Sequence, residues 1–288
     1  MQLKNLSAIL STALLSTICL INSAHAGLIV TQNNDANTLV NNILGSGVST
    51  SNISLTGANA AFGTFTGGVS AGIGIESGIM LSTGKVIDAV GPNSSDSTAT
   101  EFFTAGDADL TAIAGNPTFD AATLTFDFIS DGGDIFFDYV FASEEYNEYV
   151  NQNENDSFAF FLDGSNIALI PGTNTPVSIN TVNAGNPVGT DASNSQHFNN
   201  NSLNDGGPFF DIEYDGFTDV FQASFLGLSA GSHTISLKIA DAADSTYDST
   251  VFIRTGSFSD EASPIPEPST LIIFTLALLG LRIRQVKK

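Results

Sequence analysis

The stretch "FASEEYNEYVNQNENDS" concentrates carboxylates that could act on a glycan. Glu144 and Glu145 are adjacent, and Glu148 follows on the same segment. Two carboxylates on either side of a glycosidic bond are the usual catalytic groups of glycoside hydrolases. Neighbouring residues of a strand point to opposite faces, however, so Glu144 and Glu145 share a site only at a bulge or turn. In the alternative, Ser143 caps a helical turn whose dipole favours these glutamates.

No further acid, base or nucleophile accompanies these glutamates. We therefore predict that the protein has no catalytic residues and is not an enzyme, with a secreted carboxylate-dependent glycan hydrolase as the alternative. His197 and His233 are isolated in the sequence, so zinc has no ligand set.

Two segments offer oxygen ligands of the kind that calcium prefers. In "DAADSTYDS", between two expected strands, the candidates are Asp241, Asp244 and Asp248. In "NQNENDS", before another expected strand, they are Asn153, Asn155 and Asp156. A bound ion would remove the repulsion between these carboxylates and connect the strands. In the alternative, Asp and Asn bond to their own backbone in solvated turns. We expect no cofactor other than calcium.

The segment "DIEYDGFTDVFQ" imitates a calcium-binding EF-hand loop. The bidentate glutamate that such a loop needs at its twelfth position is replaced by Gln222, and no helices are expected around it. A strand explains the segment more simply, because Ile212 and Tyr214 would face inward. The acidic residues would then face water: Asp211, Glu213 and Asp215.

These side chains must be positioned by short strands. Apolar residues alternate with polar ones in "TLTFDFIS", "IFFDYVFA" and "HTISLKIA", as expected for strands with one buried face. "SFAFFLDGSNIALI" predicts two strands around an Asp163-Gly164 turn. "HTISLKIA" and "STVFI" suggest a second hairpin. Near the start, "NDANTLVNNILGSG" predicts one short helix, capped by Asn34 or Asp35 and ended by Gly45.

Many short strands without alternating helices predict an all-β fold. We expect an antiparallel β-sandwich of the jelly-roll or Greek-key kind, with a phenylalanine-rich core between two sheets. The sequence contains 22 Phe, which supply ample apolar surface for such a core.

Both ends of the chain carry targeting signals. Residues 1–26 combine Lys4, an apolar stretch and a small-x-small site, which predicts a signal peptide cleaved between Ala26 and Gly27. Cleavage would remove Cys19, the only cysteine, so the exported protein would form no intramolecular disulfide. At the other end, the apolar run after Pro268 is followed by Arg and Lys residues. A run this short is a marginal permanent anchor, but it would hold the protein in the inner membrane transiently.

The net charge is -22, from 30 acidic and 8 basic residues. Nucleic acid and anionic lipid are therefore poor partners for the exported domain, and we expect no binding to nucleic acid. Cations, neutral glycans and basic proteins remain compatible with this charge.

The tail resembles the bacterial PEP-CTERM sorting signal through Pro266, Glu267 and Pro268, the short apolar helix and the basic end. The resemblance implies cleavage by an exosortase. In the domain, "FASEEYNEYVNQNENDSFAFFLDG" and "GIESGIMLSTG" resemble the choice-of-anchor L domain, a bacterial surface module. We therefore expect a signal peptide over 1–26, a sandwich domain over 27–262 and a sorting segment over 263–288. The resemblances imply an exported surface or matrix protein, with extracellular polysaccharide or surface proteins as partners in biofilm.

Overall fold

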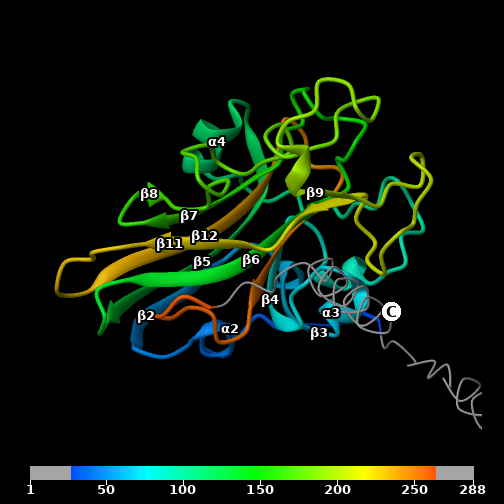
Figure 1. Ribbon diagram of the computed structural model, residues 1–288. Coiled ribbons are helices and arrows are strands. Elements are labelled where there is room, and N and C mark those ends of the chain that lie inside the picture. The colour runs from blue at the N-terminus through cyan, green and yellow to red at the C-terminus, as the bar shows by residue number, and fades with distance from the viewer. Residues whose placement is uncertain (1–26, 264–288) are drawn as a thin grey trace, which may run out of the picture.

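A computed structural model describes residues 27–263 as a sandwich of two antiparallel sheets (Figure 1). The predicted all-β sandwich is therefore confirmed. The proposed signal peptide and the proposed sorting helix lie outside the described residues. Between residues 27 and 263, no helix has the length and apolar character needed to cross a membrane.

The larger sheet has eight strands and the smaller sheet has five. In spatial order, the larger sheet contains β1 (Ile29–Gln32), β3 (Phe62–Thr66), β4 (Ser77–Ser82), β13 (Ser249–Arg254), β6 (Ile135–Ser143), β10 (Gly216–Thr218) and β9 (Phe198–Asn200), and β11 (Phe221–Phe225) also pairs with β6. The smaller sheet contains β2 (Val48–Thr56), β5 (Thr118–Ser130), β12 (His233–Ala242), β7 (Ser157–Leu162) and β8 (Ser165–Asn166).

Short helices lie outside the two sheets. They are α2 (Ala36–Ile43), α3 (Gly68–Ala71), α4 (Ala108–Ala114) and the 3-10 turns η1 (Asn59–Ala61), η2 (Val86–Ala89) and η3 (Ser195–His197). The predicted N-terminal helix is α2, and the Asp35 side chain caps it by accepting from the Thr38 amide at 2.7 Å. The sequence analysis predicts neither α3 nor α4.

The main core lies between the sheets and is rich in phenylalanine. Its inward residues follow the predicted alternation on β5, β6, β7 and β12. Phe258, which follows β13, packs against Phe126, Phe128 and Phe137 with ring centroids 5.1–5.4 Å apart. A second apolar cluster, which includes Val140, covers the other face of the larger sheet. The central strands of that sheet are therefore buried on both faces.

The two predicted hairpins have different outcomes. β7 and β8 form the first, since Leu162 pairs with Ser165 across the Asp163-Gly164 turn. Both turn residues have positive φ, as a tight two-residue turn requires. The second prediction is wrong: β12 pairs with β5 and β7, whereas β13 pairs with β4 and β6. The acidic loop 243–248 therefore crosses from one sheet to the other at the end of the sandwich.

Candidate functional site

Buried carboxylates collect at the end of the sandwich where this crossing occurs. Ser143 ends β6 and Ser249 begins β13, and their hydroxyl oxygens are 2.8 Å apart. The Ser249 hydroxyl donates to Asp156 Oδ2 at 2.7 Å, and the Ala242 amide donates to Asp156 Oδ1 at 2.9 Å. Asp156 directly precedes β7, and its carboxylate accepts from β13 of the larger sheet and from β12 of the smaller one. It therefore links strands of both sheets.

Asp241 reaches this cluster from the core-facing side of β12. Ile235, Leu237 and Ile239 all face the core, and regular alternation would turn Asp241 inward as well. The register with β5 shifts between Ile239 and Asp241, as at a β-bulge. Asp241 is buried beside Asp156, and neither of its carboxylate oxygens has a hydrogen-bond partner.

Glu144 and Glu145 follow Ser143 directly and are also buried. Both are at most 1% exposed, and all four of their carboxylate oxygens lack a hydrogen-bond partner. The Glu145 amide donates to the Ser143 hydroxyl at 2.9 Å, and the Tyr149 amide donates to the Glu145 carbonyl at 3.1 Å. A hydrogen-bonded turn therefore follows Ser143, but it is not the helical turn that the alternative interpretation expected, since no helix lies between β6 and β7 and the Tyr146–Asn147 peptide is cis.

The six predicted calcium ligands do not all meet. The structure brings Asp156 and Asp241 together, and Asp248 is buried nearby. Asp244 is exposed and accepts from Thr246, although its charge acts on Glu145. Two asparagines complete the predicted set. The Asn155 side chain accepts from the Asn180 amide at 2.9 Å, and Asn153 is exposed.

Acidic residues of the EF-hand-like segment are placed differently from the sequence prediction. Ile212 and Tyr214 are buried as expected, but Glu213 and Asp215 are buried too, at 6% and 0% exposure. The expectation that these carboxylates face water is therefore wrong. The segment is not a regular strand, since β10 begins only at Gly216, and loop 91–101 covers the carboxylates.

The enclosed carboxylates resist ionisation. Burial, together with the charges of Asp215 and Glu213, raises the pKa of Glu144 to about 11. Burial likewise raises the pKa of Asp215 to about 8 and that of Asp248 to about 7. The pKa values of Glu145 and Asp241 are raised by burial and by the Asp156 charge. Charging these groups therefore requires compensation from a cation.

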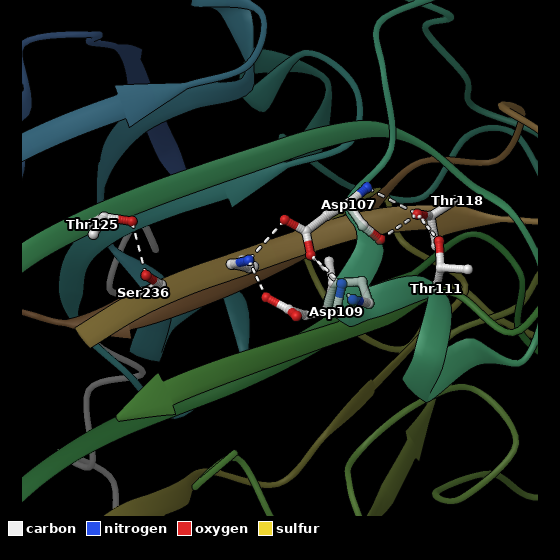
Figure 2. A network of polar contacts seen from close by, with 8 residues as sticks. Asp107, Asp109, Thr111, Thr118, Thr125 and Ser236 are labelled. Carbon is white, nitrogen blue, oxygen red and sulfur yellow. Dashed lines mark hydrogen bonds and ion pairs between the residues drawn. The ribbon is translucent and has the colours of Figure 1, made fainter. Parts of the chain in front are cut away.

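Basic side chains of the protein do not supply that compensation. Within residues 27–263 the Lys and Arg residues are Lys85, Lys238 and Arg254. Lys238 on β12 binds Asp107 and Asp109 at the start of α4, both at 2.7 Å (Figure 2). Arg254 binds the buried Asp138 at 2.7 Å, and the exposed Lys85 lowers the pKa of Asp248 only in part, since burial raises it more.

The donor set fits a hard cation only if neutral oxygens complete it. In the described part of the chain, no three acidic, His or Cys side chains converge on one point as metal ligands. Calcium commonly takes carbonyl, hydroxyl, amide and water oxygens beside its carboxylates. One neutral oxygen of this kind is the Thr83 hydroxyl. It lies beside Asp241 but is not placed to form a hydrogen bond with it.

Comparisons with known proteins agree with the two resemblances noted in the sequence. A family model described as Choice-of-anchor L domain matches residues 29–259. A model described as PEP-CTERM protein-sorting motif matches residues 264–288. No curated protein and no solved structure matches the chain significantly.

Proposed function

Because the chain belongs to the choice-of-anchor L family, we propose that it is a non-catalytic surface module whose contact with extracellular polysaccharide depends on bound calcium. It is an exported cell-surface protein, and its C-terminal motif is a substrate of an exosortase. Under this proposal, residues 1–26 are the signal peptide, 27–262 are the surface module and 263–288 are the sorting segment. Biofilm polysaccharide or a surface protein would be its partner.

The observation that carries the calcium proposal is Asp241, a buried carboxylate with no partner for either oxygen. A proton shared with the neighbouring Asp156 would remove its charge and satisfy one oxygen, but it would leave the other oxygen unsatisfied in the interior, which costs about 1–3 kcal/mol per group. A hard cation satisfies both the charge and the oxygens. Asp156 is its neighbour in this site, and the Asp156 and Asp244 charges both act on Glu145, so these residues share one acidic environment.

Calcium at this position would connect the two sheets. Asp241 belongs to β12 of the smaller sheet, and Glu145 follows β6 of the larger one. The ion would therefore stabilise the end of the sandwich without a disulfide, and it would order the acidic loop that joins β12 to β13. Figure 1 shows that long connections around β9 gather near this end.

A shallow hollow on these connections is our candidate surface for a glycan. It is lined by Pro92, Pro208, Phe210 and Asp211, with Phe209 at its edge 58% exposed. An exposed aromatic ring beside a polar acceptor suits a sugar, because the apolar face of the sugar can stack on the ring while a hydroxyl donates to the carboxylate.

Hydrolysis is the second candidate, and the burial of Glu144 and Glu145 argues against it. A hydrolase needs its carboxylates on both sides of a bond that a polymer can reach, and these groups are enclosed. Glutamine substitutions at Glu144, Glu145 and Glu148 separate the two functions. Loss of glycan cleavage with unchanged stability would support the hydrolase, whereas binding without turnover supports the module.

Binding of the purified full chain to a glycan array, with calcium and with a chelator, tests the proposal. We expect the protein to bind at least one class of polysaccharide when calcium is present. This binding should be lost in chelator, and it should be lost in the Phe209→Ala variant. Phe103→Ala is the matched control, because Phe103 is also exposed and lies away from the hollow lining. Equal binding with and without calcium would contradict the calcium dependence.

A further inference from the structure

Residues 201–215 form a loop that connects β9 to β10 in the larger sheet. The loop is closed at its base, because the Asn201 amide donates to the Asp215 carbonyl at 2.8 Å. It contributes Phe209 and Asp211 to the hollow that is our candidate glycan surface. The shape of the hollow therefore depends on what fixes the conformation of this loop.

The Asn201 side chain lies inside the loop, and all of its hydrogen-bonding capacity is used. The residue is 0% exposed. Its Oδ1 accepts from the Phe209 and Phe210 amides at 2.7 and 2.9 Å. Its Nδ2 donates to the Ile212 and Tyr214 carbonyls, both at 3.0 Å. A carboxamide offers two donor hydrogens and one oxygen with two lone pairs, so these four bonds satisfy it completely.

We propose that Asn201 positions Phe209 for ligand binding, so that the hollow is already formed before a glycan arrives. The inference rests on the proposed function, since the hollow is its candidate glycan surface. It goes further by naming the residue that holds this surface in shape. Asn201 is a positioning residue, because its enclosed side chain cannot touch the ligand itself.

The first support is the placement of two successive phenylalanine rings. The Phe210 ring packs against Phe217 with ring centroids 4.8 Å apart, and it occupies the space that a side chain at Gly72 would need. The Phe209 ring is 58% exposed. One oxygen of Asn201 binds the amides of both residues, so the backbone between the two rings is fixed. Stacking of a ligand on a ring that is held in this way requires little further ordering of the protein.

The second support is the attachment of the loop to its neighbours. The Asp211 amide donates to the Ala71 carbonyl of α3 at 3.0 Å. A side chain at Gly91 would overlap the backbone of Asp211, so the loop lies directly on the segment that precedes Pro92. Pro92 lines the hollow as well. These contacts fix where the loop lies, and the Asn201 side chain fixes the conformation of its backbone.

The third support is the number of backbone groups that depend on this one side chain. Two amides and two carbonyls of the loop would lose their partners together if the Asn201 carboxamide were removed. A backbone group that is enclosed without a partner is costly, so the closed conformation would no longer be favoured. Local opening of the loop toward water would then compete with it, and Phe209 would lose its fixed place.

Hydrogen exchange of the Phe209 and Phe210 amides, followed by NMR on the purified full chain, tests the positioning role without any ligand. In the parent protein we expect both amides to exchange at least about 100-fold more slowly than in an unstructured peptide. In Asn201→Ala we expect their exchange to become about tenfold faster, since each amide loses a hydrogen bond. Exchange in the parent protein at the rate of an unstructured peptide would overturn the inference.

Asn183→Ala is the matched control. Asn183 is also 0% exposed, and its side chain holds a different loop by donating to the Ile179 carbonyl at 2.9 Å and accepting from the Gly185 amide at 3.0 Å. That loop does not line the hollow. Both variants should lower the melting temperature, but only Asn201→Ala should speed exchange of the two phenylalanine amides. Equal exchange in both variants would show that Asn201 supports the fold in general and does not position the loop.

The glycan array in calcium separates this inference from the proposed function. Asn201→Ala should lose the binding that Asn183→Ala retains. If the parent protein binds no glycan, the proposed function fails, and the exchange rates alone decide whether Asn201 holds the loop. If Asn201→Ala binds glycan as well as the parent does while its amides exchange faster, the positioning role in binding is overturned. Asn201→Ser keeps one hydroxyl partner for the loop, so it provides the same comparison should Asn201→Ala not fold.

Discussion

A carboxylate that is buried without partners destabilises the metal-free protein, and Asp241 is such a residue. We expect Asp241→Asn to stabilise the protein in chelator by about 1–3 kcal/mol, because the amide removes the charge that burial disfavours. The same change should abolish the stabilisation by calcium, because a ligand is lost. Urea denaturation with calcium and with chelator measures both effects. Equal destabilisation under both conditions would show that Asp241 has a packing role only.

At the scale of single residues, the sequence indicates which acidic residues could bind a cation, but it does not indicate which of them are buried. Asp156, Asp241 and Asp248 stand out because they crowd the loops beside expected strands. Glu145 was recognised only as a catalytic candidate or a turn residue, since its burial depends on how β6, β12 and β13 meet. Asp215 was misplaced because its environment is made by loop 91–101, which is remote in sequence. Such contacts leave no local pattern.

At the scale of elements, the β7–β8 hairpin is fixed to β12 by an ion pair that depends on pH. His233 Nδ1 lies 2.6 Å from Asp163 Oδ2, and His233 Nε2 lies 2.9 Å from the Ser229 carbonyl. The Ser229 carbonyl and Asp163 raise the His233 pKa above its usual 6.5. Burial raises the Asp163 pKa, but the His233 and Thr234 hydrogen bonds outweigh it, so the net shift is downward.

The sign of the pH dependence follows from these shifts. Because the folded His233 pKa is raised, its contribution is complete below pH 6.5 and disappears as the pH rises through the folded value. The lowered Asp163 pKa keeps the contribution until the pH falls below the usual 3.8. We expect His233→Gln to cost about 1 kcal/mol at pH 5.5, a value reduced because Asp163 is half exposed, and less at pH 9.

Denaturation of the parent and of His233→Gln at both pH values measures this effect. His197→Gln is the matched control, because His197 lies 3.4 Å from Asp219 in a more exposed contact. A cost for His233→Gln that is the same at pH 5.5 and pH 9 would contradict the ion pair.

Phe258 connects α2 to the core of the sandwich. Its backbone pairs with Ile43 and Gly45 after α2, at 2.9 and 2.8 Å. Its fully buried ring packs among phenylalanines of both sheets. We expect Phe258→Ala to cost about 3–5 kcal/mol in unfolding free energy, because it leaves a cavity. Phe209→Ala, at an exposed ring, should change it by less than about 0.5 kcal/mol. Similar losses of unfolding free energy in the Phe258→Ala and Phe209→Ala variants would contradict the role of Phe258 in the core.

The strands β5, β6, β7 and β12 were predictable, because period-two alternation of apolar residues marks the core-facing side of each. The pairing partners of these strands were harder to predict. The sequence "HTISLKIADAADSTYDSTVFI" suits a hairpin, yet its two strands lie in different sheets. A short acidic connection is compatible with either arrangement. The choice depends on which sheet has a vacant position, between β5 and β7 for β12 and between β4 and β6 for β13.

At the scale of the whole molecule, the net charge of -22 provides an alternative explanation for any effect of calcium. Dissolved ions screen repulsion between surface carboxylates, and this screening depends on ionic strength. Buried carboxylates are screened much less. A specific ion inside the sandwich and a diffuse ion atmosphere therefore predict different responses to salt.

We expect calcium at about 100 times its dissociation constant to stabilise the protein by about 2.7 kcal/mol through the site around Asp241. For a domain of this size, that corresponds to a rise in melting temperature of roughly 5–10 °C. Sodium chloride at equal ionic strength should reproduce little of this rise, and magnesium should reproduce less than calcium, because it demands near-ideal octahedral geometry. Calorimetry in chelator, calcium, magnesium and sodium chloride makes the comparison. If sodium chloride raises the melting temperature as much as calcium does, screening of the acidic surface explains the effect, and the buried carboxylates bind no ion.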